Sequence, residues 1–71
     1  MNRAELIKEL ARKTDVEEKQ AAEFVGAFLE TMSDYFKKGE KVVIGEFGSF
    51  FVTPNRQIQF NPSAKLKQLV E

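Results

Sequence analysis

Two segments decide the fold of this chain: Gly45-Glu46-Phe47-Gly48-Ser49-Phe50 and Phe60-Asn61-Pro62-Ser63-Ala64-Lys65-Leu66-Lys67. The first is typical of a turn between two strands, in which Gly45 and Gly48 permit a sharp bend and two phenylalanines act as anchors. The second is typical of a strand end that runs into a short helix, with Asn61 as the cap and Pro62 in the first helical position. Only nine residues separate the two segments.

The residues around these segments predict three strands, at 41–44, 49–53 and 57–60, because they are rich in β-branched or alternating residues. Thr53-Pro54-Asn55-Arg56 is a turn signal, with proline second and asparagine third. Alternation places on the inward face Val42, Ile44, Phe50, Val52, Ile58 and Phe60. The outward face then carries Val43, Ser49, Phe51, Thr53, Gln57 and Gln59, without lysine or arginine. Phe51 beside Val43 would form an apolar interaction patch, unless its neighbours partly cover it.

Two helices precede the strands. The first runs over about residues 3–13 and is capped by Asn2, with Glu5 three residues on. The second is expected to begin at a capping box of Asp15 and Glu18, and to end before a left-handed Gly39. When the second helix is projected down its axis at 100° per residue, its apolar side chains occupy an arc of roughly 160°. The apolar arc of an ordinary surface helix is about 100° wide. This wide arc predicts packing on two sides, against the first helix and against a partner subunit; the alternative is one larger core.

Length and composition favour a single α+β domain, 1–71, that needs a partner chain for stability. A chain of 71 residues buries only a small core and usually requires disulfides, a metal or oligomerisation. Because it contains no cysteine and no histidine, disulfides, thiolate metal sites and the commonest general base are excluded. We find no catalytic constellation and no phosphate loop, so we expect no catalytic residue, no metal and no cofactor.

The charge balance counts against strong affinity for nucleic acid, since eleven basic and eleven acidic residues cancel. The charges are unevenly distributed: residues 1–13 carry net +2, residues 14–39 net −3 and residues 40–71 net +1. No signal peptide or membrane-spanning pattern is visible, so we expect a soluble, cytoplasmic protein without a membrane partner.

The order of helices and strands, with certain residues in register, resembles the bacterial HU and integration host factor family of DNA-bending proteins. The residues that carry the resemblance are Asn2, Leu6, Ile7, Phe36, Lys38, Gly39, Lys41, Val42, Phe47, Gly48, Phe50, Phe60, Pro62, Leu66 and Val70. The resemblance implies two N-terminal helices, a three-stranded antiparallel sheet and a short C-terminal helix, assembled as an intertwined dimer. The expected dimer core is Phe24, Phe28, Met32, Phe36, Phe47, Phe50 and Phe60.

The same resemblance implies sequence-independent binding of double-stranded DNA by a nucleoid-associated homodimer. The family's long basic arm lies between the two opening segments, and residues 51–59 are too few to form it. Pro54 therefore does not correspond to the wedge proline of that arm. The expected phosphate contacts are Asn2, Arg3, Lys41, Arg56, Ser63, Lys65 and Lys67. The alternatives are that these are solvated charges and caps, and that the chain is a protein-interaction module or the partner of another HU-like subunit.

Overall fold

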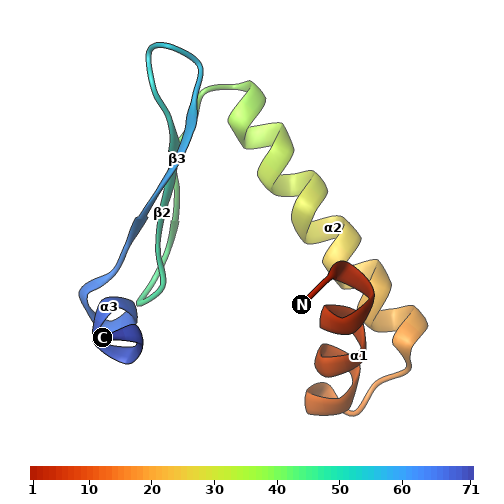
Figure 1. The fold of residues 1–71 in the computed structure, drawn as a ribbon. Coiled ribbons are helices and arrows are strands. Elements are labelled where there is room, and N and C mark those ends of the chain that lie inside the picture. The colour runs from red at the N-terminus through yellow and green to blue at the C-terminus, as the bar shows by residue number, and fades with distance from the viewer. The chain divides into compact units, whose positions relative to one another are not determined.

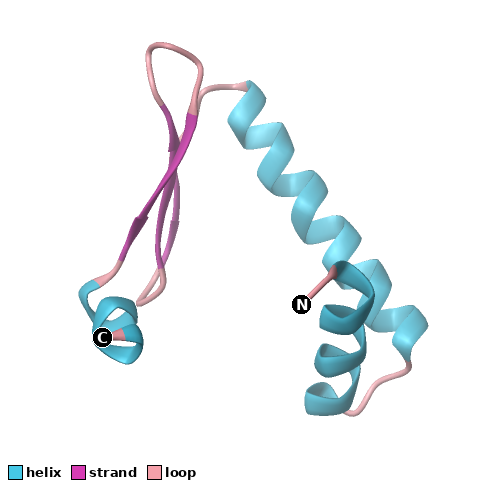
Figure 2. Cartoon of the chain, in the orientation of Figure 1, coloured by secondary structure: helices cyan, strands magenta, loops and turns pink.

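The computed structural model describes residues 1–71. Three helices and three strands follow one another along the chain (Figures 1 and 2): α1 (Arg3–Thr14), α2 (Glu18–Lys37), β1 (Val42–Ile44), β2 (Gly48–Val52), β3 (Ile58–Pro62) and α3 (Ala64–Val70). The strands form one antiparallel sheet in the order β1-β2-β3. The predicted α+β fold is thereby confirmed. The chain divides into two units, Met1–Thr31 and Met32–Glu71, which are described separately below.

Both ends of α1 are capped, the first by the side chain of Asn2 and the last by the backbone of Asp15. The Asn2 Oδ1 accepts from the Glu5 N–H at 2.9 Å, so the predicted cap is confirmed. At the other end, Asp15 adopts the left-handed conformation at φ 55 and its N–H donates to the Ala11 carbonyl. The predicted capping box at Asp15 is therefore wrong, because this residue ends α1 while α2 begins only at Glu18. Aspartate is one of the few non-glycine residues that tolerate this backbone region.

The end of α2 is fixed by Gly39, as predicted. Gly39 has φ 72, and its N–H donates to the Phe36 carbonyl at 3.0 Å. The N–H of Glu40 donates to the Tyr35 carbonyl, also at 3.0 Å. This pair of hydrogen bonds is the Schellman motif, which satisfies two of the carbonyls that a helix end leaves unpaired.

The strand register confirms the predicted inward and outward faces. Phe50 pairs with Val42 on one side and with Phe60 on the other, while Phe51 pairs with Gln59. Since side chains alternate along a strand, the two phenylalanines and Val42 share one face and Phe51 lies on the opposite face. On the inward face, the rings of Phe50 and Phe60 lie 4.7 Å apart between centroids.

The β2–β3 hairpin closes through the turn that the sequence predicts. The Arg56 N–H donates to the Thr53 carbonyl at 2.9 Å, and the Thr53 N–H donates to the Gln57 carbonyl at 2.8 Å. Arg56 follows the turn in the left-handed conformation, at φ 64. A three-residue loop of this kind, a type I turn followed by one left-handed residue, matches the twist of the flanking strands.

The β1–β2 turn differs from its prediction in one respect. The Phe47 N–H donates to the Ile44 carbonyl at 3.0 Å, but Glu46, at φ 64, takes the left-handed position instead of Gly45. Gly48 has a different role, since a Cβ added to it would lie 2.5 Å from a ring carbon of Phe60. Gly48 also has φ 158, so the close approach of β3 and the backbone conformation both favour glycine at position 48.

The start of α3 also differs from its prediction. Asn61 and Pro62 are the last residues of β3, where they pair with Ser49 and Gly48. The cap is Ser63, whose Oγ accepts from the Leu66 N–H at 3.0 Å. The predicted cap at Asn61 is wrong because pairing with β2 keeps the chain extended for two further residues.

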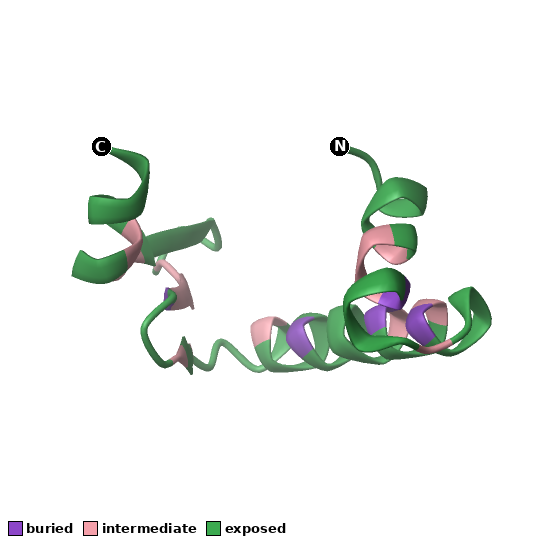
Figure 3. Ribbon diagram, turned by 90° about the horizontal axis from the view of Figure 1, so that it is seen from below, coloured by how far each residue is buried: buried purple, intermediate pink, exposed green.

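The chain alone covers few apolar side chains. Buried positions lie where α1 and α2 face each other in the unit Met1–Thr31 (Figure 3), and these are Ala11, Ala21 and Val25. On α2, the side chain of Phe24 is 69 % exposed and that of Phe28 is 52 % exposed. Within that unit, part of the apolar arc of α2 packs on α1 and part of it remains uncovered. The prediction that α2 packs on α1 is confirmed.

Candidate nucleic-acid interface

The two units of the chain differ in net charge, because the acidic side chains are fewer in the unit that contains the sheet. Residues Met32–Glu71 carry six basic and four acidic side chains, net +2. Residues Met1–Thr31 carry five basic and seven acidic side chains, net −2. A chain that is neutral as a whole therefore presents one unit with a surplus of positive charge, which is the electrostatic requirement for contact with a polyanion.

Ser63 connects the β1–β2 turn to α3. Its hydroxyl donates to the Glu46 carbonyl at 2.7 Å, and its N–H donates to the Phe47 carbonyl at 2.9 Å. Its Oγ accepts from Leu66 in the cap described above. Both protons of Ser63 are therefore used inside the chain. A phosphate contact by Ser63, which stays a prediction, requires one of these bonds to break.

The two lysines of α3 differ in their partners. Lys65 Nζ lies 3.3 Å from Glu46 Oε2, and both side chains are largely exposed. Exposed ion pairs of this kind contribute at most about 1 kcal/mol, so a phosphate can replace the carboxylate at little cost. Lys67 is exposed and forms no ion pair. Lys41, which directly precedes β1, is likewise exposed and without an ion pair.

The start of α1 is the other predicted contact region. The capping oxygen of Asn2 is engaged with Glu5, which leaves the amide group of its side chain available. A Cβ added to Gly26 would lie 3.7 Å from Arg3 Nη2, so the guanidinium of Arg3 lies against α2. Arg3 therefore combines an exposed charge with packing against a helix.

A third basic feature lies at the hairpin turn and includes a residue that sequence reasoning missed. Arg56 and Lys37 line the same hollow, of about 280 Å³, together with Ser33, Phe36, Val52 and Ile58. Figure 1 shows the C-terminal end of α2 beside the β2–β3 turn. The sequence indicates for Lys37 only a favourable position at the end of a helix dipole. No local pattern reveals its proximity to Arg56, because the two residues are 19 positions apart in the chain.

The outward face of the sheet carries no charge. Val43 is 67 % exposed there, whereas Phe51 is mostly buried by its neighbours. The structure thus agrees with the alternative in which neighbours partly cover Phe51, and Val43 is the more accessible member of the predicted patch. Counterion release, which drives the binding of nucleic acid, gains little from such a face.

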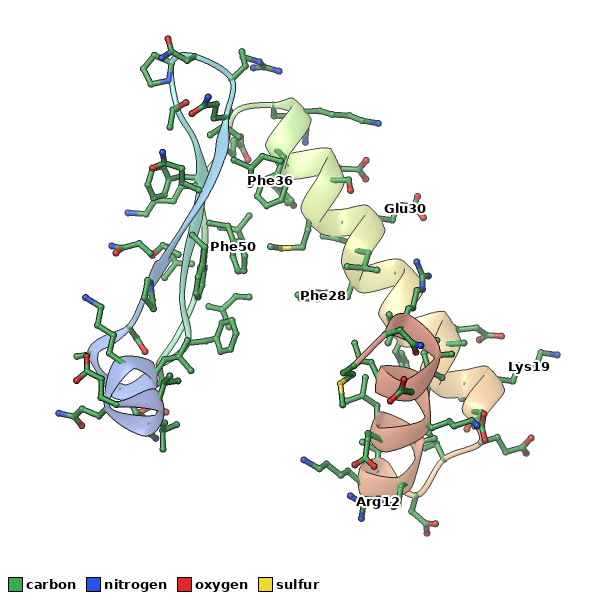
Figure 4. All side chains as sticks on the ribbon, viewed as in Figure 1. Arg12, Lys19, Phe28, Glu30, Phe36 and Phe50 are labelled. Atoms are coloured by element: carbon green, nitrogen blue, oxygen red, sulfur yellow. The ribbon has the colours of Figure 1, made fainter.

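The residues predicted for the dimer core form an apolar surface in each unit. In Met1–Thr31 there is an apolar groove of about 440 Å³, lined by Arg3, Leu6, Leu10, Phe24, Val25, Phe28 and Leu29. In Met32–Glu71 the rings of Phe36 and Phe50 point toward each other (Figure 4), with their centroids 6.2 Å apart. Phe47 and Phe60 extend this aromatic cluster, and each is at least 40 % exposed. Met32 is buried.

Comparison with known proteins identifies the family. A sequence model of the family described as bacterial DNA-binding protein matches residues 1–57. The chain belongs to the HU family of bacterial DNA-binding proteins. Among curated HU-family proteins, DNA-binding protein HU-beta 2 of Neisseria meningitidis is 34 % identical over 59 residues. That alignment covers 83 % of this chain and 65 % of the relative.

Further HU-family relatives extend the comparison. The SPbeta prophage-derived DNA-binding protein HU 2 of Bacillus subtilis is 44 % identical over 52 residues, which cover 73 % of this chain and 56 % of the relative. The chain thus spans less than two thirds of the length of either curated relative. The structure of HU from Thermotoga maritima is similar with a TM-score of 0.91 and 38 % identity, and a mutant of the same protein reaches 0.97 at 37 %. Both matches cover all of this chain and all of the solved chain.

None of the helices combines the length and the apolar character needed to cross a membrane. No group of three acidic, histidine or cysteine side chains is placed to hold a metal ion.

Proposed function

We propose that this member of the HU family is a non-enzymatic protein that binds double-stranded DNA as a homodimer, independently of sequence, in the bacterial nucleoid. The observation that carries the proposal is the family match over residues 1–57, together with the fold shared with HU of Thermotoga maritima over the whole chain. The positive surplus of the unit Met32–Glu71 supports an anionic partner. The curated relatives are named as DNA-binding proteins.

The proposed homodimer follows from the uncovered apolar surface. Phe24 and Phe28 line an open groove in one unit, and Phe47 and Phe60 are partly exposed in the other. Burying a half-exposed phenylalanine contributes about 1–1.5 kcal/mol, so two copies of each such residue provide a substantial driving force. A second copy of the chain offers apolar groups of the same kind, and a 71-residue chain has little core of its own. Under this proposal residues 1–71 act as a single domain within the dimer.

The proposed DNA contacts are phosphate contacts made by the body of the protein. The candidates are Asn2, Arg3, Lys41, Arg56, Ser63, Lys65 and Lys67, of which Ser63 is the least available because both its protons are engaged. With about four to six phosphates neutralised per dimer, log affinity falls against log salt with a slope of about −4 to −5. Such contacts position the protein on the duplex and carry no sequence information.

Binding is proposed to be weaker, and to bend DNA less, than in family members with a long arm. This proposal is supported by the tight turn between β2 and β3, which Thr53 and Gln57 close. Insertion of an apolar wedge between base steps, which kinks the duplex, requires such an arm. The uncharged outward face of the sheet adds little to the affinity.

The test is a titration of labelled duplex DNA, followed by fluorescence anisotropy at several salt concentrations, on linear, nicked and pre-bent duplexes of unrelated sequence. We expect equal affinity for all linear sequences and the salt slope given above. Light scattering on the protein without DNA should give twice the mass of the chain. Failure of the purified protein to bind any duplex at low salt would rule out the proposed function.

One observation favours a second candidate, a protein-interaction or heterodimerisation module. Val43 is 67 % exposed on an uncharged sheet face, and the chain as a whole is neutral. Mixing the chain with an HU protein from the same cell, followed by native mass spectrometry, would reveal mixed dimers. A defined protein partner whose binding is lost in Val43→Ser and retained in Lys19→Ser would also favour this candidate. A homodimer that binds DNA and forms no mixed dimer would count against it.

A further inference from the structure

The hollow beside the hairpin turn contains two cations without a partner. Lys37 and Arg56 both line it, both are exposed, and neither forms an ion pair. No acidic residue lines the hollow, whose other walls are Ser33, Phe36, Val52 and Ile58. Asp34 and Glu40, the acids nearest to Lys37 in sequence, form no ion pair either. Two like charges thus face one space that offers no compensating negative charge.

An anion in this hollow would lower the electrostatic energy of both side chains. Apolar walls reduce the local dielectric screening, which strengthens the attraction of each cation for an anion compared with bulk water. The C-terminal end of α2 contributes partial negative charge nearby, but the carbonyls of Tyr35 and Phe36 accept hydrogen bonds in the Schellman motif. The two cationic side chains are therefore the only fully charged groups among the residues that line the hollow.

The backbone at Arg56 provides a second, independent observation. Arg56 occupies the left-handed position that follows the type I turn, at φ 64. Glycine adopts this conformation at the lowest cost, and a side chain such as that of arginine costs about 1 kcal/mol more. The chain therefore places a guanidinium at the hairpin turn despite a backbone penalty, which is the pattern of a residue retained for a contact.

We propose that Lys37 and Arg56 together form one phosphate site at the hairpin turn, which holds a backbone phosphate of duplex DNA. The inference rests on the proposed function and adds Lys37 to its contacts. The planar guanidinium presents two parallel donors to a phosphate, and the lysine adds a point charge from α2. If a second copy covers the apolar walls of the hollow, the charged ends of both long side chains stay at its solvent edge.

The chemistry of the site is that of a phosphate group, which either DNA or a free phosphate can provide. The experiment is the anisotropy titration described above, on wild type, Lys37→Gln, Arg56→Gly and the double variant, with tripolyphosphate as competitor in a second arm. Lys19→Gln is the matched control, because Lys19 is an exposed, unpaired cation in the other unit. Arg56→Gly removes the side chain that would contact DNA without disturbing the fold, because glycine adopts the observed left-handed backbone at the lowest cost.

We expect each single substitution to make the salt slope less negative by about 1–2 per dimer, whereas Lys19→Gln leaves it unchanged. Because the two side chains share a phosphate, the double variant should lose less binding free energy than the sum of the single losses. Arg56→Gly should weaken DNA binding without lowering the melting temperature. Tripolyphosphate should compete with DNA only at much higher concentration than unlabelled duplex.

Four results would overturn the inference. In the first, wild type binds DNA, and Lys37→Gln and Arg56→Gly bind it with the same affinity and salt slope as Lys19→Gln. This result leaves the proposed function intact and removes this site. Additive losses in the double variant show two separate contacts instead of one site. Competition by tripolyphosphate at the same concentration as duplex assigns the site to a free phosphate compound. Absence of any DNA binding by wild type overturns the proposed function and this inference together.

Discussion

Gly48→Ala should be among the most damaging single substitutions in this chain, although it adds only one methyl group. A Cβ at this position would lie 2.5 Å from Phe60 Cε1, 2.8 Å from Phe60 Cζ and 2.6 Å from the Asn61 carbonyl oxygen. The ring can turn away, but the carbonyl oxygen belongs to the neighbouring strand. Relief of this contact therefore requires β3 to move away from β2 at the pair of Gly48 and Pro62.

Overpacking of a protein interior by added methyl groups costs about 1–3 kcal/mol. The present contact is with backbone, so we place the loss of unfolding free energy at the upper end, about 3 kcal/mol. For a domain of this size, 1 kcal/mol shifts the melting temperature by about 4–8 °C, so the melting temperature should fall by about 12–24 °C.

The assay is thermal unfolding by far-ultraviolet circular dichroism at one fixed protein concentration, since association shifts apparent stability. Gly45→Ala is the matched control, because a Cβ there meets nothing within 4 Å and its φ is not positive. This control should match wild type or gain up to about 1 kcal/mol, because alanine restricts the unfolded chain. A Gly48→Ala protein that melts within 3 °C of wild type, or an equal loss in Gly45→Ala, would refute the reasoning from the close approach of β3.

Three further substitutions test other parts of the structure by the same melting assay or by hydrodynamics. Glu46→Gly should raise the melting temperature by a few degrees, because it relieves a left-handed backbone at φ 64 and loses only an exposed ion pair with Lys65; a lower melting temperature would contradict this. Ser63→Ala should cost about 1–2 kcal/mol and speed hydrogen exchange at the Leu66 amide, and unchanged exchange would show that the cap is unimportant. Phe24→Glu should convert the proposed dimer to a monomer in light scattering, and a dimer of unchanged mass would place Phe24 outside the interface.

The local features of the fold could be predicted from the sequence because they depend on residues only a few positions apart. Gly39 ends α2 and Thr53-Pro54-Asn55-Arg56 forms the hairpin turn, as their residue types indicate. Alternation along β2 correctly assigned Phe50 and Phe51 to opposite faces.

Predictions failed where two local signals competed and a distant partner decided between them. Asn61-Pro62 has the residue types of a helix start, yet both residues pair with β2, and Ser63 caps α3 instead. Ser63 in turn is held by the carbonyls of Glu46 and Phe47, which lie 17 and 16 positions earlier. No pattern within a few residues contains that information.

The sequence by itself determined the order of helices and strands, the faces of the sheet and the family resemblance, because periodicity and turn residues act over short distances. Only the tertiary structure decided which glycine is indispensable, which part of the α2 arc packs on α1, and which basic residues line one hollow. Gly48 is constrained by a strand 13 positions later, and Lys37 lines the same hollow as Arg56 only because the hairpin turns back beside the end of α2. These are contacts between segments distant in the chain, and their geometry is set by strand register and packing.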